Sequence, residues 1–231
     1  PHSGHGKRLS SSYERQLSRV FWFFLLAMIF TNFGRNSIVA IKTQYLSLDQ
    51  GFNVSSNLLS YIVNMESLAM LIMGLFIAKL SRHYRDFILL LMGAVAATMT
   101  LSGYALANAL PLIFPSNFLA GVSEVLIFAA SYSYVSRLIP PQQRGRRFAF
   151  FNATYFLSWG GAGTLVAGPI IDSLLERGVA QTLAYRVAFL SSTILVVIGV
   201  VVLFATEKLN KKIPPAGKVV TDQQSERVVT T

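Results

Sequence analysis

Long apolar stretches occupy most of the chain between Val20 and Thr206. A lipid hydrocarbon core of about 30 Å is crossed by a helix of about 20 residues. The stretches that reach this length are 20–46, 55–79, 86–108, 111–138, 147–173 and 183–206. The sequence therefore predicts an all-α integral membrane protein, a six-transmembrane-helix bundle. We expect a cytoplasmic N-terminal segment at 1–19 and a cytoplasmic polar tail at 207–231.

The composition agrees with a membrane class of protein. Only 13% of the residues are charged, whereas water-soluble domains carry about 25%. The segments between the apolar stretches are too short for an additional soluble domain. The absence of cysteine excludes disulfides and thiolate metal sites, and the histidines have no metal-site spacing. We therefore expect one bundle with no metal and no other cofactor.

Basic residues are distributed unevenly between the two ends of the predicted helices. They precede 20–46, follow 183–206, and fill the connections after 55–79 and after 111–138. The positive-inside rule then predicts that both termini are cytoplasmic, in a protein of the cell membrane. The net charge of +10 is explained by contacts with the lipid bilayer, so we expect no nucleic-acid partner.

Two predicted helices carry polar residues along one face. Asn32, Arg35 and Asn36 recur at helical spacing within 20–46, as Asn117 and Glu124 do within 111–138. A charge in hydrocarbon is costly unless it faces protein or water. Each helix therefore presents a polar stripe with one charge near the middle of the membrane.

Arg35, Glu124 and Glu66 fall at similar predicted depths, so Arg35 is expected to pair with Glu124 or with Glu66. Such a pair could merely hold the bundle together. It could instead line a water-accessible cavity that binds a charged substrate or relays protons. We favour the second role for Arg35 and Glu124, and the first for Glu66, because its helical neighbours Ile62 and Met70 are apolar.

The stretch 147–173 is rich in glycine and contains the dipeptide Gly168-Pro169. Small residues allow close helix packing, and proline bends a membrane helix. The favoured interpretation is tight packing with a kink. The alternative is a hinge or gate, in which case Asn152, Tyr155 and Trp159 face a cavity.

These features resemble one half of a major facilitator superfamily transporter. The resemblance is carried by the six stretches, the basic connection after 55–79, the loop 140–146 with its Pro-Pro and basic residues, and Gly168-Pro169. It implies two six-helix halves that alternate access to a central cavity. It also implies structural or gating roles for Arg82, Arg85, Arg144, Gly168 and Pro169.

The family motifs are only partly present. After 55–79 the chain has Ala78 and Arg82 where the family pattern has Gly and Asp, and Asn117 stands where an arginine precedes Gly121. Thr164 replaces the glycine that leads the Gly-Pro motif. The motifs therefore indicate the architecture and no subfamily.

The sequence thus predicts half of a secondary active transporter for a small anionic or amphipathic solute. A C-terminal half is preferred; an N-terminal half, or a six-helix protein that pairs with a second bundle, remains open. The other function considered is a non-transporting membrane scaffold or assembly subunit, and no catalytic motif suggests an enzyme. The candidate cavity-wall residues are Asn32, Asn36, Asn117, Asn152, Tyr155 and Trp159, beside the charged residues Arg35, Glu66 and Glu124.

Overall fold

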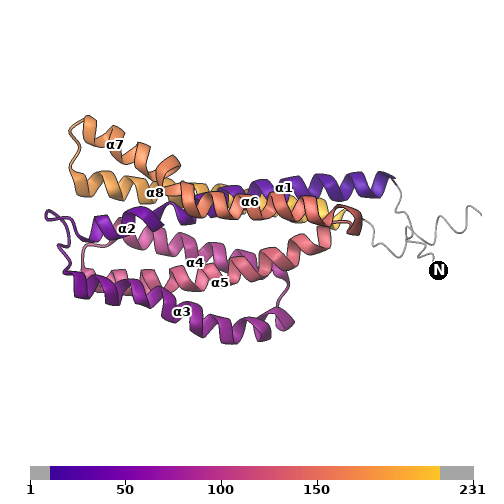
Figure 1. Ribbon diagram of the computed structural model, residues 1–231, viewed down its shortest axis with the longest axis horizontal. Helices are drawn as coiled ribbons and strands as arrows, with labels where there is room; N and C mark the ends of the chain where they lie inside the picture. Colours follow the sequence, from indigo (N-terminus) through magenta and orange to yellow (C-terminus); the bar gives the residue numbers. More distant parts are fainter. Residues whose placement is uncertain (1–10, 214–231) are drawn as a thin grey trace, which may run out of the picture.

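The computed structural model describes residues 11–213, and this part of the chain is helical, without strands. The helices lie side by side along one axis (Figure 1). Their bounds are α1 Ser11–Asn36, α2 Ile38–Leu46, α3 Ser56–His83, α4 Asp86–Leu106, α5 Ile113–Leu138, α6 Arg144–Ala162, α7 Gly168–Glu176 and α8 Gln181–Lys211.

Five helical segments of the described chain are long and apolar enough to cross a membrane. They are Tyr13–Leu46, Ser56–His83, Asp86–Leu106, Leu110–Leu138 and Gln181–Lys211. Each matches one of the apolar stretches in the sequence, so the all-helical membrane class is confirmed. The predicted span 147–173 is not among them, and in the structure this segment is divided.

The division lies between α6 and α7. A π-helical turn, Gly163–Ala167, separates them, and the Gly168 N–H donates to the Gly163 carbonyl five residues back. Pro169, which follows, has no N–H to donate to the α-helical ladder. Such a π-turn inside a helix often accompanies a functional site. The sequence predicted a kink in 147–173, and in the structure the α-helix of this segment is interrupted by the π-helical turn.

The first predicted span is also made of two helices, which join at Ser37. The Ser37 Oγ lies 2.7 Å from the Gly34 carbonyl oxygen and 2.6 Å from the Ser192 Oγ of α8. The Ser37 N–H still donates to the Phe33 carbonyl. A serine that bonds back to its own helix bends it slightly, so α1 and α2 continue in nearly one direction.

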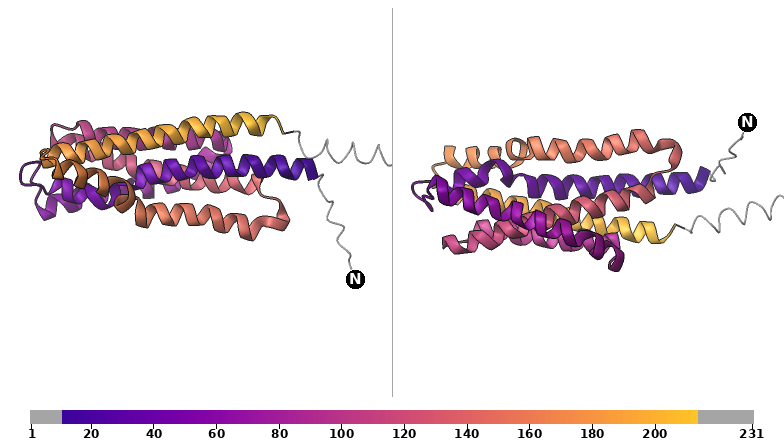
Figure 2. Two further views of the ribbon diagram at one scale, coloured as in Figure 1. Left: turned by 90° about the horizontal axis from the view of Figure 1, so that it is seen from above. Right: turned by 60° about the horizontal axis from the view of Figure 1, so that its bottom comes forward.

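The two ends of the described chain lie at the same end of the bundle (Figures 1 and 2). Tyr13 and Leu17 at the start of α1 line one small cavity with Asn210 and Ile213, which lie at and beyond the end of α8. We call this end of the bundle the terminal end. The α3–α4 and α5–α6 connections lie there too (Figure 1).

The apolar core is divided into two clusters. The terminal-end cluster includes Phe24, Leu126 and Phe151, and the far-end cluster includes Tyr104 and Phe189. Along α1–α2 and α6–α7, buried polar residues lie between the two clusters: Asn32, Arg35, Asn36, Ser37 and Ser158. The middle of the bundle therefore contains a polar layer between two apolar ones.

Candidate functional site

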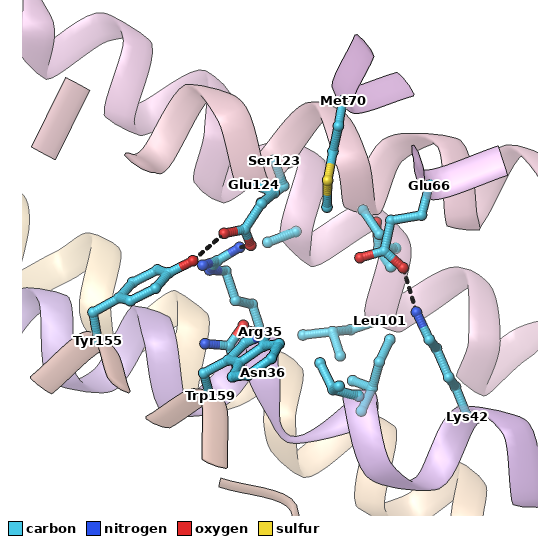
Figure 3. Close-up of a pocket in the computed structure, with 15 residues that line it drawn as sticks. Arg35, Asn36, Lys42, Glu66, Met70, Leu101, Ser123, Glu124, Tyr155 and Trp159 are labelled. Atoms are coloured by element: carbon cyan, nitrogen blue, oxygen red, sulfur yellow. Dashed lines mark hydrogen bonds and ion pairs between the residues drawn. The ribbon is translucent and has the colours of Figure 1, made fainter. Parts of the chain in front are cut away.

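A partly open cavity of about 280 Å³ lies in the polar layer. Figure 3 shows its charged residues on two facing walls. Arg35 of α1 and Lys42 of α2 lie on one wall, with Trp159 of α6. Glu66 of α3 and Glu124 of α5 lie on the other.

Arg35 forms an ion pair with Glu124 across the cavity. The Arg35 side chain is only 6% exposed, and that of Glu124 is 20% exposed. The Arg35 Nε donates to the Asn32 Oδ1 at 3.3 Å, while the Tyr155 hydroxyl donates to Glu124. These contacts offset part of the cost of removing both charges from water.

A second ion pair, between Lys42 and Glu66, lies beside the first. Lys42 is not among the site residues predicted from the sequence. The signal that could have found it is spacing, because Lys42 follows Arg35 by seven residues and two helical turns return a side chain to the same face.

Gly121 brings the two acidic residues onto one wall. A Cβ at this position would lie 2.2 Å from the Glu66 carbonyl oxygen and 2.8 Å from the Ala69 Cβ. Only glycine therefore allows α3 to approach α5 this closely. Glu124 follows Gly121 by about one turn of α5. The close approach of α3 therefore places Glu66 on the same wall of the cavity as Glu124.

Six of the residues predicted from the sequence line the cavity: Arg35, Asn36, Glu66, Glu124, Tyr155 and Trp159. Asn36 also donates through Nδ2 to the Ser158 Oγ at 3.0 Å. Asn32 lies behind the cavity, where it orients Arg35. The structure therefore brings together the two polar faces that the sequence showed.

Two predicted wall residues lie elsewhere. Asn117 is fully buried between α4 and α5, and its Nδ2 donates to the Tyr104 hydroxyl and to the Ile113 carbonyl. Asn152 accepts a hydrogen bond from the Tyr132 hydroxyl of α5. Both amides are used in contacts between helices, and neither lines the cavity.

The residues with predicted structural or gating roles lie outside the cavity. Gly168 and Pro169 join the π-helical turn to α7, and Arg82 and Arg144 are exposed at the terminal end. Arg85 lies there too and pairs with Glu207 at 3.1 Å. The sequence did not predict a role for Glu207. It also did not predict the neighbouring ion pair, in which the Arg137 Nη2 lies 2.9 Å from the Asp86 Oδ2.

Some polar atoms of the cavity residues have no partner. The Arg35 Nη2 and the Ser123 Oγ are buried without a hydrogen bond, and both residues line the cavity. Within residues 11–213, no group of three or more His, Asp or Glu side chains could hold a metal ion. The site therefore offers paired charges and free hydrogen-bond donors to a ligand.

Membrane-length apolar helices around a charged cavity define an integral membrane protein with the features of a carrier. Residues 23–228 match the family model described as Major Facilitator Superfamily. The chain therefore belongs to the major facilitator superfamily, as the sequence resemblance predicted, and it is a membrane transporter of this type. No curated protein matches the chain.

Proposed function

We propose that the chain forms one six-helix half, preferably the C-terminal one, of a secondary active transporter that moves a small solute by alternating access. The six crossings are α1–α2, α3, α4, α5, α6–α7 and α8. The observation that carries the proposal is the pair of Arg35 and Glu124, which lies beside a cavity midway along the bundle. The solute would bind in this cavity.

The energetics of buried charge support a functional cavity. A buried ion pair is on average no more stabilising than apolar residues of the same volume. The middle of this bundle nevertheless contains two such pairs, together with unpartnered donors of Arg35 and Ser123. A bundle that only needed mechanical support would be stabilised as well by aliphatic side chains. Ligand binding or proton exchange gives these groups a use.

The exposed faces of α3 and α6 support a second bundle as partner, either the other half of the same protein or a separate subunit. Leu71 and Leu75 of α3 are 65% and 75% exposed, and Phe156 of α6 is 65% exposed. Both helices flank the cavity through Glu66 and Trp159. A second bundle packed on these faces would complete the cavity wall, as in transporters built from paired repeats.

The basic residues of the terminal end support a cytoplasmic orientation in the cell membrane. Arg82, Arg144 and Arg146 are exposed there, while fewer basic residues lie at the far end. By the positive-inside rule, the terminal end would face the cytoplasm.

Single-cysteine labelling tests the proposal without knowledge of the substrate, because the chain contains no cysteine. Ala120→Cys places a thiol in the cavity, and Leu75→Cys places one on the exposed apolar face of α3 as control. In oriented vesicles, a membrane-impermeant thiol reagent should label Ala120→Cys from both sides and leave Leu75→Cys unlabelled.

The outcomes separate the candidate functions. Labelling of Ala120→Cys from only one side would contradict alternating access. Labelling from neither side would favour the non-transporting scaffold, whose charges would serve only to hold the bundle together.

A further inference from the structure

We propose that the cavity binds a zwitterionic solute, a small molecule that carries both a carboxylate and an ammonium group. This inference rests on the proposed transport function and names the substrate class of the same cavity. It differs from the anionic solute expected from the sequence in that the solute carries both charges.

The first support is the charge balance of the cavity. Arg35 and Lys42 contribute two positive charges on one wall, and Glu66 and Glu124 contribute two negative charges on the other (Figure 3). A solute with a net charge would add an uncompensated charge to a site withdrawn from water, which is costly. A zwitterion adds none.

The second support is that both ion pairs cross the cavity. Arg35 reaches Glu124, and Lys42 reaches Glu66, so that each pair joins the α1–α2 wall to the acidic wall. A zwitterion inserted between Arg35 and Glu124 directs its carboxylate to the first and its ammonium to the second. Each protein charge then keeps an opposite charge beside it. A simple anion would leave Glu124 without one, and a simple cation would leave Arg35 without one.

The third support is the set of unused hydrogen-bonding atoms. The Arg35 Nη2 and the Ser123 Oγ have no partner, and a carboxylate supplies two acceptor oxygens in the geometry that arginine prefers. On the acidic wall, Glu66 accepts from Lys42 through Oε2 only. Its Oε1 takes part in no hydrogen bond within the described chain. Free donors and a free acceptor are what the two ends of a zwitterion require.

The size and the remaining walls of the cavity limit the solute. Its volume of about 280 Å³ is near the lower end of small-molecule sites. Met70, Leu101 and Trp159 give it an apolar portion. A molecule of amino-acid size with an apolar side chain fits these limits.

Matched probes test the proposal in the complete purified protein. The zwitterions are alanine, leucine, phenylalanine, γ-aminobutyrate and alanylalanine. Each is compared with the amine and the carboxylic acid of the same carbon skeleton, by thermal stabilisation and by protection of Ala120→Cys from a thiol reagent. At least one zwitterion should bind about 10-fold or more tightly than its amine and its acid.

Two variants locate the binding. Arg35→Gln should abolish binding of that zwitterion. Ser123→Ala removes a hydroxyl that has no partner, so the fold should be retained while affinity falls about threefold to tenfold. Ser191→Ala is the matched control, since its hydroxyl only bonds the Val187 carbonyl of α8, and it should bind as the wild type does.

Each remaining outcome overturns the inference. Equal or tighter binding of the acid or the amine would identify an anion or a cation site. Absence of binding by the whole panel would exclude the zwitterion class. If Ala120→Cys is still labelled from both sides in that case, the transport proposal survives without this substrate class. If labelling fails as well, both proposals fall.

Discussion

The ion pairs in the cavity and those at the terminal end share the same chemistry but differ in solvation. At the terminal end, the Arg85 and Arg137 side chains are 69% exposed, and their partners Glu207 and Asp86 are 5% exposed. In the cavity the order is reversed, because Arg35 is 6% exposed and its partner glutamate 20% exposed. The terminal-end arginines keep most of their hydration, and the cavity arginine does not.

This difference indicates different roles. Arg85 and Arg137 can stabilise the ends of α4, α5 and α8 at little cost, since their guanidinium groups remain in water. Within residues 11–213, Arg35 forms an ion pair with Glu124 alone, and its Nη2 still lacks a partner. A buried arginine with spare bonding capacity beside a cavity is suited to exchange its partner for a ligand.

The largest expected effect follows from Glu124→Gln. This substitution leaves the Arg35 guanidinium buried without an opposite charge, which should cost about 3–5 kcal/mol of unfolding free energy and abolish solute flux. Glu207→Gln leaves an arginine that is still hydrated, so it should cost less than half as much. Reversible unfolding in mixed micelles measures both variants, and equal losses would remove the distinction between the two regions.

A smaller effect is expected from Gly121→Ala, which adds a Cβ 2.2 Å from the Glu66 carbonyl oxygen. Because α3 must shift, we expect a loss of about 1–3 kcal/mol and altered labelling of Ala120→Cys. Gly145→Ala is the control, since a Cβ there meets nothing within 4 Å. If Gly121→Ala behaved as this control does, the close approach of α3 to α5 would not be what positions the acidic wall.

Asn117→Ala should affect stability and leave the cavity unchanged. The loss of the bond to Tyr104 should cost about 1 kcal/mol, because the amide serves the contact between α4 and α5. Labelling of Ala120→Cys should match that of the wild type in rate and in sidedness. A changed sidedness would show that Asn117 acts in the cavity after all.

The smallest effect is expected from Arg137→Gln. Its side chain is largely exposed, and the Ser133 hydroxyl still donates to Asp86 at 3.0 Å. We therefore expect a loss of less than about 1 kcal/mol and unaltered binding in the cavity. A larger loss, measured by the same unfolding assay, would place the terminal-end pairs in the same energetic class as the cavity pairs.

The helical periodicity of the sequence predicted the central features of the site. Arg35, Asn36 and Glu124 lie on faces that a 3.6-residue repeat identifies, and the length of the apolar stretches sets their depth. Asn117 satisfies the same repeat, yet its amide bonds Tyr104 of α4. Periodicity gives the face of a helix, and it does not say which neighbouring helix covers that face.

Three features could not be read from the sequence in this way. Lys42 was not predicted as a site residue, although the cavity extends two turns beyond Arg35. The π-helical turn Gly163–Ala167 changes the hydrogen-bond register without changing the composition. The buried carboxylates of Asp86 and Glu207 meet their arginines only because the ends of α4, α5 and α8 converge.

A pair of double-mutant cycles compares the buried ion pair of the cavity with the hydrated ion pair of the terminal end. One cycle combines Arg35→Gln with Glu124→Gln, and the other combines Arg85→Gln with Glu207→Gln, each measured by unfolding free energy. We expect a coupling of about 2–3 kcal/mol for the cavity pair and no more than about 0.5 kcal/mol for the terminal-end pair. Equal couplings, or a cavity coupling near zero, would contradict this expectation.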